Sequence, residues 1–183
     1  MIAPLEGRSQ RTRSALIQSF VTLIFRDGFD RISVGGIVAQ AGTARSTFYE
    51  HFSSKEDILQ ASMAQFFTVM ADCVSDDQQP TELVRVLTHF WENRRMADAV
   101  FSGHPRVTLE RSLIDMIERR LRETDSTAKP LLPGRLTAIH VAGAQLALID
   151  SWLRGRAFCE AEDMATALHR SSRASALALL GQP

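Results

Sequence analysis

The sequence predicts an all-α protein. Apolar residues recur three and four positions apart through most of the chain, as in Leu16, Phe20 and Leu23, which is the spacing of an amphipathic helix. No segment alternates convincingly between apolar and polar residues with the period of two that indicates a half-buried strand. The chain has 183 residues, of which 45% are hydrophobic and 23% charged. It can therefore bury a sizeable core, either as one large domain or as a small and a medium one.

Turn residues divide this helical pattern into separate elements. The predicted helices cover residues 9–27, 33–40, 44–50, 54–75, 81–99, 106–123, 134–154 and 161–180. Polar segments at 76–80 and 124–130 predict loops, and 97–105 predicts a short turn. Where the first three helices give way to longer ones, we expect a boundary between a domain at 1–53 and a second domain at 54–183.

Local residues at the ends of these helices support the division. Gly28 follows the first helix where a left-handed C-cap is expected. Ser33 and Thr43 are placed as the N-caps of the next two helices, because a side-chain oxygen there accepts a hydrogen bond from a free backbone N–H. The segment 53–56, Ser-Ser-Lys-Glu, resembles a capping box at the start of the fourth helix.

Cysteine and histidine are sparse and scattered. Cys73 and Cys159 stand far apart without a Cys-x-x-Cys pair, which predicts no disulfide framework and no zinc site, and fits a reducing compartment. His89, His104 and His140 are isolated, so surface or core roles are favoured over metal binding. No activated nucleophile, carboxylate pair or phosphate-binding loop stands out. We expect no metal, no cofactor and no enzymatic activity.

The N-terminal segment, the length of the apolar runs and the net charge restrict where the protein is expected to be located and what it is expected to bind. The N-terminus lacks the basic and apolar regions of a signal peptide, and no apolar run approaches the roughly 20 residues that cross a bilayer. We therefore expect a cytoplasmic protein that does not enter the membrane. The formal net charge is zero, which by itself argues against nucleic acid as the partner.

Residues 33–52 predict a helix-turn-helix. Ile37-Val38 forms the buried side of a first short helix, and Gly42 permits the positive φ that a tight reversal between crossed helices requires. Phe48 and Phe52 supply the buried anchors of a second short helix, which has little stability of its own and must be held by packing.

The exposed end of that second helix is rich in hydrogen-bond donors. They are carried by Arg45, Ser46, Thr47 and Tyr49. Such a helix suits a DNA major groove, where Arg45 could reach guanine O6 and N7 while Thr47, Tyr49 and His51 could reach phosphates. The alternative is an ordinary solvated helix face.

A fixed residue pattern runs through this region without gaps. It consists of Ile37-Val38, Ala41-Gly42, Thr47-Phe48-Tyr49, His51-Phe52 and Lys55-Glu56. With this pattern, residues 9–60 resemble the DNA-binding domain of the TetR/AcrR family of bacterial transcriptional regulators. The resemblance implies a three-helix DNA-binding domain joined to a C-terminal helical domain for ligand binding and dimerisation.

The resemblance also implies particular contacts with double-stranded DNA. Phosphate contacts would fall on Ser33, Thr47, Tyr49, His51 and Lys55, and base contacts on Thr43, Arg45 and Ser46. Ala44 departs from the family's usual Ser, and Ser46 from a common Gly. Gly35-Gly36 replaces polar helix formers, either because DNA approaches the backbone closely or because the fold tolerates the pair; we favour tolerance.

Charge is distributed unevenly along the chain. Residues 1–55 contain seven basic and four acidic side chains, an excess of three positive charges, so the remainder carries an excess of three negative charges. Arg8, Arg11 and Arg13 lie near the start of the first helix, where the helix dipole disfavours them. Phosphate beside them would account for their position. The neutral total thus conceals a basic N-terminal segment.

The C-terminal helices are apolar on more than one face, which implies burial beyond one domain core. The resemblance implies a homodimer whose interface includes Ala142, Leu146, Ile149, Leu168 and Leu177. It also implies a pocket for a small-molecule effector of unknown identity. Candidate lining residues are Phe67, Met70, Phe90, Trp91, Phe101, Met116, His140, Gln145 and Trp152. Aromatic and Met residues at helical spacing are more often core residues, and that alternative stays open.

Together these observations predict a ligand-responsive regulator. We expect a repressor that binds a palindromic operator as a homodimer through the helix-turn-helix at 33–50 and is released by a small apolar effector. The alternatives are a small-molecule-binding enzyme and a DNA-binding structural protein without an effector.

Overall fold

The protein, seen in a computed structural model, consists of helices joined by turns throughout the residues that the structure describes, which are 3–75, 81–94, 100–101, 103–123 and 129–181. The elements are α1 (Ala3–Asp27), the 3-10 turn η1 (Phe29–Arg31), α2 (Val34–Ala41), α3 (Arg45–His51), α4 (Lys55–Asp72), α5 (Thr81–Glu92), α7 (Gly103–Glu123), α8 (Gly134–Leu153) and α9 (Ala161–Leu179). The prediction of an all-α fold is confirmed. The predicted turn at 97–105 lies partly outside the described residues, and its described end begins α7.

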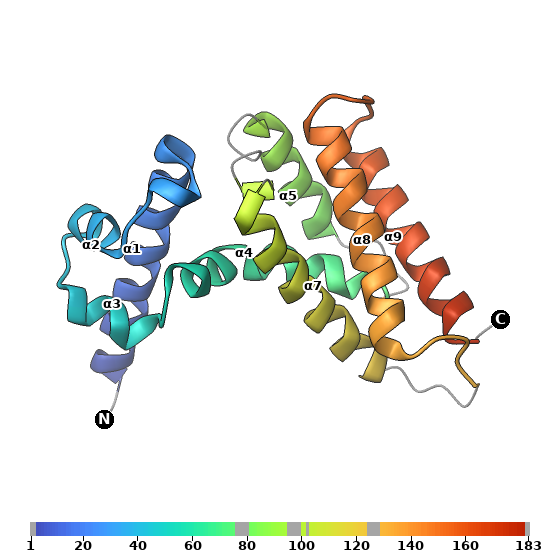
Figure 1. Cartoon of the computed structure of the whole chain (residues 1–183), viewed down its shortest axis with the longest axis horizontal. Coiled ribbons are helices and arrows are strands. Elements are labelled where there is room, and N and C mark those ends of the chain that lie inside the picture. Colours follow the sequence, from blue (N-terminus) through green and yellow to red (C-terminus); the bar gives the residue numbers. More distant parts are fainter. Residues whose placement is uncertain (1–2, 76–80, 95–99, 102, 124–128, 182–183) are drawn as a thin grey trace.

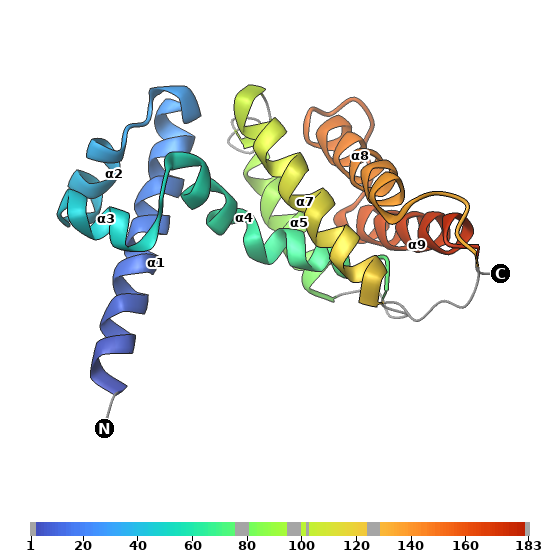
Figure 2. The ribbon, with the colours of Figure 1, turned by 60° about the horizontal axis from the view of Figure 1, so that its bottom comes forward.

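The helices form two groups, which we call the head (α1 to α3, residues 3–52) and the body (α4 to α9, residues 55–181). In the head, α1 packs against α2, and α2 against α3. In the body, α7 packs on α4 and α8, and α9 packs on α5 and α8. Figure 1 shows α4 running from the head into the body, and Figure 2 shows the N-terminal end of α1 projecting past α3.

Helix boundaries agree with the sequence to within one residue except at four ends, one of which is the start of α7, at Gly103 instead of residue 106. α1 begins at Ala3 instead of residue 9, because Pro4 is compatible with a first helical turn, where the backbone N–H has no intrahelical partner. α4 ends at Asp72 instead of residue 75. α5 ends at Glu92, and most of the remainder of that predicted helix lies outside the described residues.

The helix caps confirm some predictions and correct others. Ser33 caps α2, its Oγ accepting a hydrogen bond from Gly36 N at 3.1 Å. Thr43 does not cap α3, whose N-cap is Ala44, without a side-chain hydrogen bond. Gly28 has a positive φ of 77° but a ψ of 154°, so it is not a left-handed C-cap.

The capping box at the start of α4 lies one residue later than predicted. Ser54 is the N-cap and accepts a hydrogen bond from Asp57 N at 3.2 Å. The Asp57 carboxylate reaches back to accept from both the backbone N and the Oγ of Ser53, at 2.9 and 3.1 Å. The side-chain cap of the motif is therefore present at Ser54, whereas the Asp57 carboxylate returns to Ser53, one residue before the N-cap, and not to the N-cap backbone as in the full motif.

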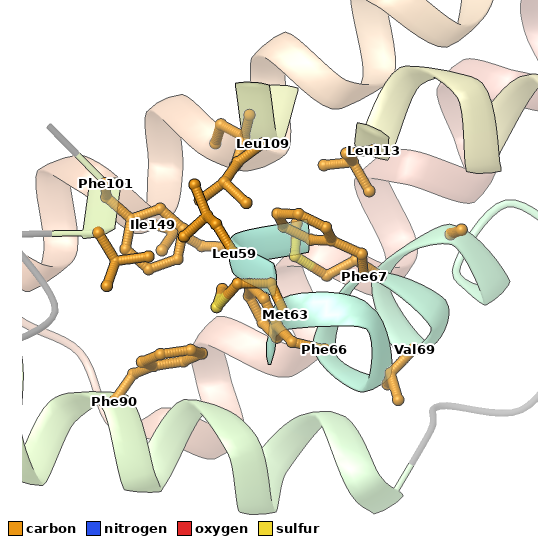
Figure 3. Packing of buried hydrophobic residues seen from close by; sticks show 14 of the residues in the cluster. Leu59, Met63, Phe66, Phe67, Val69, Phe90, Phe101, Leu109, Leu113 and Ile149 are labelled. Atoms are coloured by element: carbon orange, nitrogen blue, oxygen red, sulfur yellow. The ribbon is translucent and has the colours of Figure 1, made fainter. Parts of the chain in front are cut away.

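Both groups have buried apolar cores. In the head, Leu16, Phe20 and Ile24 of α1 are buried, as is Ile37 of α2. In the body, side chains of α4 lie against α5, α7 and α8, as Figure 3 shows for Leu59, Met63, Phe66, Phe67, Phe90, Leu109, Leu113 and Ile149. The core is therefore continuous along α4, which contributes to both groups.

By length and composition alone α8 could cross a membrane, with a mean hydropathy of 1.3. This corrects the expectation that no apolar run of the chain approaches the length of a membrane span. Half of the apolar segment is buried inside the fold, and Gln145 within it donates hydrogen bonds to Met70 O at 3.0 Å and Ser172 Oγ at 2.8 Å. A core helix of a folded domain has these same properties, so they are weak evidence for a membrane span.

Candidate nucleic-acid interface and ligand cavity

The turn between α2 and α3 is fixed by backbone geometry. Gly42 adopts a left-handed conformation, with φ 64° and ψ 33°, and its N–H donates to Ala39 O at 3.3 Å. Thr43 N donates to Val38 O at 2.9 Å. Together these bonds satisfy the last carbonyls of α2 and set the crossing of the two helices. Residues 33–50 thus form a helix-turn-helix.

α3 is held by its apolar side and presents its polar side. Phe48 is fully buried and Phe52 is 2% exposed, so packing supplies the stability that seven residues cannot supply alone. On the opposite side Arg45, Ser46 and Tyr49 are exposed. The head therefore presents a rigid helix with a polar outer surface.

Arg45 and Tyr49 are neighbours on that surface. An Arg45 Nη2 donates to Tyr49 Oη at 3.4 Å, and the guanidinium lies 5.9 Å from the centre of the Tyr49 ring. Tyr49 in turn packs edge-on against the buried Phe48, with ring centres 5.4 Å apart. These contacts restrict the Arg45 side chain before it meets a partner, which lowers the entropy lost on binding.

A polar hollow lies beside α3 and brings several predicted residues together with α1. It has a volume of about 480 Å³ and is lined by Arg8, Ser9, Thr12, Thr43, Ala44, Thr47, Glu50 and His51. Thr43 Oγ1 is buried and has no hydrogen-bond partner in the described part of the chain. The sequence indicated the basic start of α1, but Ser9 and Thr12 were missed because their role depends on how α1 crosses α3.

Lys55, a predicted DNA contact, also forms contacts within the fold. Its Nζ donates to Phe29 O at 2.9 Å and to Ile32 O at 3.3 Å, and lies 4.2 Å from the centre of the Phe29 ring. An ammonium has three donor hydrogens, so two are already used. Ser33 is similar: its oxygen caps α2, while its hydroxyl hydrogen can still donate.

Charge in the head is partly neutralised. Arg26 and Asp27 form an ion pair at 2.8 Å, and the hydrogen bond from Arg26 holds the pKa of the Asp27 carboxyl below its usual range. Arg13 lies 5.1 Å from the centre of the Phe52 ring. Arg8, Arg11 and Arg45 remain exposed, so the positive charge gathers near α3 and the start of α1.

The predicted effector residues do not surround one cavity. Phe67, Met70, Phe90, Phe101, Gln145 and Trp152 are buried, Trp91 and Met116 are half-buried, and His140 is exposed. Trp91 stacks on Trp152 at 4.8 Å. Phe67, Met70, Phe90, Phe101 and Trp152 belong to the buried apolar core of the chain, as the core interpretation of the same pattern expects.

A cavity of about 570 Å³ lies elsewhere, between the head and the body. It is lined by Phe20, Val21, Ile24 and Phe25 of α1, by Ser62, Met63, Gln65 and Phe66 of α4, by Arg85, Val86, Thr88, His89, Phe90 and Glu92 of α5, and by Val100. Phe90 is the predicted effector residue that lines it. Sequence reasoning missed this cavity because its walls come from helices far apart in the chain.

The predicted dimer residues mostly face inward. Ala142, Leu146, Ile149 and Leu168 are buried in the chain's own core, and Leu177 is half-buried. The four buried residues therefore leave no surface for a partner. The same helices expose other apolar residues, with Leu136 48%, Ile139 42% and Leu148 41% exposed.

No cluster of three or more His, Cys, Asp or Glu side chains able to hold a metal ion occurs among the residues that the structure describes. Cys73 is buried, where its Sγ donates to Val69 O at 3.4 Å, and Cys159 is half-buried.

A basic head with a helix-turn-helix, carried on a helical body, is the architecture of a helix-turn-helix transcriptional regulator. Residues 16–62 match the family model of bacterial regulatory proteins, tetR family. This match covers the helix-turn-helix and the start of α4, so this part of the chain is similar to TetR-family regulators.

Sequence relatives match over the head. The chain is 37% identical over 57 residues to an uncharacterised HTH-type transcriptional regulator, YvdT, of Bacillus subtilis, covering 31% of this chain and 29% of that one. It is 28% identical over 57 residues to a DNA-binding transcriptional repressor TetR of Mycobacteroides abscessus, covering 31% and 30%. The matches thus span about a third of the chain and of these curated relatives.

Solved structures match over nearly the whole chain. A TetR transcriptional regulator of Streptococcus agalactiae is similar with a TM-score of 0.55 and 22% identity, covering 91% of this chain and 96% of that one. NalD of Pseudomonas aeruginosa, a secondary repressor of the MexAB-OprM multidrug efflux pump, is similar with a TM-score of 0.55 and 19% identity, covering 92% and 97%. The body therefore shares the TetR fold even where sequence similarity is low.

Proposed function

We propose that this chain is a ligand-responsive transcriptional repressor of the cytoplasm, which binds a palindromic DNA operator as a homodimer and is released by a small apolar effector. The observation that carries the proposal is the exposed, pre-ordered Arg45-Tyr49 pair on a rigid helix-turn-helix. The match of residues 16–62 to the tetR family model supports DNA binding. Repression is supported by the M. abscessus and P. aeruginosa proteins, both of which are described as repressors.

DNA recognition divides into two kinds of contact. Arg45 is at the N-terminal end of α3, and a guanidinium there can donate two hydrogen bonds to a guanine edge. Thr43, Thr47 and His51 line the hollow beside Arg8, where donors and a positive charge suit a phosphate. Ser33, Ser46, Tyr49 and Lys55 complete the proposed contact surface.

Arg45→Ala tests this division. Against a palindromic site selected from genomic fragments, the variant should lose about 1–3 kcal/mol of binding free energy and lose preference at one base pair of each half-site. Arg31→Ala is the control, because Arg31 is an exposed arginine of the head that lies outside α3. Affinities measured at several salt concentrations for specific and random duplexes decide the outcome. An equal loss on both duplexes for Arg45→Ala overturns the proposed base contact.

Dimerisation is proposed through the outer face of α8 and α9. At 100° per residue, Ala147 and His140 fall at the centre of the exposed face of α8, with Ile139 and Leu148 on opposite flanks, and the half-buried Gly143 lies between Ala147 and Ile139. α9 exposes Ala167, Ala174 and Ala178. Small residues between larger apolar ones allow two helices to approach closely and bury the flanks.

Ala147→Glu should break such a dimer. Because the change places a charge at the centre of an apolar contact, the dissociation constant of the dimer should rise at least about a hundredfold. Sedimentation equilibrium measures it, and Ala64→Glu is the matched control, since Ala64 is an exposed alanine of α4. Dimers of unchanged strength in Ala147→Glu would place the interface elsewhere.

A further inference from the structure

We propose that the cavity between the head and the body is a binding site for a neutral, mostly apolar molecule that contains at least one ring. The site deepens the proposed function, on which its effect on DNA binding rests. The volume of about 570 Å³ is within the range of small-molecule sites. Of the predicted effector residues, Phe90 lines this cavity, whereas Phe67, Met70 and Trp152 are buried in the core of the body.

The inner wall is apolar and aromatic. Phe66 and Phe90 meet edge to face with ring centres 4.8 Å apart, and Phe101 packs on both at 6.2 and 5.5 Å. Phe20 and Met63 continue this wall, and both are almost fully buried. Ring edges and faces fixed in this way offer an aromatic ligand favourable stacked or edge-on contacts.

The outer rim limits the charge of the ligand. Arg85 lies at the rim, but its Nε donates to Glu82 Oε2 at 3.0 Å and the two side chains form an ion pair. The guanidinium is thus already neutralised and does not require an anion. Glu92 also lines the cavity but is exposed, so water and salt screen its charge. Gln65 and His89 are exposed at the same rim, where an amide and an imidazole can hydrogen-bond with one uncharged polar group.

The two long walls belong to different groups. One is the C-terminal half of α1, where Phe20 also packs edge-on against Phe29 of the head at 6.4 Å. The other is α5, which packs on α4 and α9 of the body. The shape of the cavity therefore depends on how the head is oriented relative to the body. A ligand that fits one orientation better shifts the population towards it, which is the condition for coupling to DNA binding.

N-phenyl-1-naphthylamine is a suitable probe, because it is neutral, contains fused and single rings, has one N–H, and fluoresces in apolar surroundings. Fluorescence titration of the full chain should show one probe bound per chain. Val86→Trp and Val21→Trp should each weaken binding at least tenfold, because they fill the cavity from its two walls. Val84→Trp, the same change on α5 outside the lining, should leave the dissociation constant within about twofold. Circular dichroism and thermal unfolding check that each variant is folded.

The probe should also weaken binding to the selected DNA site by about fivefold or more in the wild type, and not in Val86→Trp. Absent probe binding, or equal probe binding in wild type, Val86→Trp and Val21→Trp, overturns the site. Probe binding in the cavity without any change in DNA affinity overturns the coupling. DNA binding measured without probe tests the proposed function separately, since its failure leaves the cavity result intact.

Discussion

Lys55→Met removes a charge that holds the head together. The ammonium donates to the carbonyls of Phe29, the first residue of η1, and Ile32, the residue that follows η1. Methionine keeps most of the apolar length of the side chain, so the main loss is the charged donor. The change leaves two partly buried carbonyls without this partner and releases the first turn of α4 from η1.

The size of the effect follows from these contacts. A hydrogen bond that involves a charged group contributes about 1.5–3 kcal/mol, and a cation above an aromatic ring contributes about 0.5–1 kcal/mol at an exposed site. Because Lys55 is only half-buried, water replaces part of the loss. We expect the free energy of unfolding to fall by about 2–3 kcal/mol, a large share of the roughly 5–15 kcal/mol of a typical domain.

Urea unfolding followed by circular dichroism measures this change. With a slope of about 1–3 kcal/mol per molar urea, the midpoint should fall by about 1–2 M while the slope stays the same. Lys129→Met is the matched control, because Lys129 is the other lysine of the sequence and is exposed before α8. A change below about 0.5 kcal/mol, the scatter of ordinary surface substitutions, combined with a shallower salt dependence of DNA binding, refutes the structural role and leaves Lys55 as a phosphate contact alone.

Two further predictions concern a helix start and a thiol. Gly35→Ala should raise the free energy of unfolding by up to about 1 kcal/mol, because an added Cβ meets only Ser33 Oγ at 3.7 Å; a lower urea midpoint contradicts this. Burial, with Asp163 and Glu160 nearby, raises the pKa of the Cys159 thiol, so the neutral thiol is favoured in the folded state. The resulting contribution of Cys159 to the free energy of unfolding is present below the pKa of the thiol in the unfolded chain. It is lost as the pH rises through the raised pKa of the thiol in the folded chain. Iodoacetamide should therefore alkylate Cys159 more slowly in the folded than in the urea-unfolded chain at pH 8.5, and Asp163→Asn should speed the folded reaction; equal rates contradict the shift.

The helices and the helix-turn-helix could be predicted because their signals are local. Periodic apolar residues mark a helix, and Gly42 marks the reversal after α2 through a backbone conformation that other residues rarely adopt. The N-cap residues of α3 and α4 were each predicted one residue too early. Ser54 is the N-cap of α4 in place of Ser53, and the acidic side chain that reaches back is Asp57 in place of Glu56. Two consecutive serines offer two N-cap positions that differ by one residue.

The dimer and effector residues could not be predicted from apolar periodicity alone, because periodicity does not show which helix faces pack against the chain's own core. α8 is apolar around most of its circumference, so the sequence alone does not say which residues face the chain's own core. The structure places Leu146 inside and Ile139 outside. The cavity poses the same difficulty, because Phe20 and Phe90 are 70 residues apart in sequence and line the same cavity only because α1 and α5 both pack on α4.

α4 is the element through which the proposed ligand and DNA sites influence each other. Its first turn is joined to the head by Lys55, and its last turn is joined to α7 by the Asp72–Arg120 ion pair at 2.7 Å. Midway, Met63 and Phe66 line the cavity. A close-packed helix held at both ends moves as a unit instead of deforming locally. Any ligand that displaces Phe66 therefore also moves the residues that fix η1 and, through them, the angle at which α3 is presented.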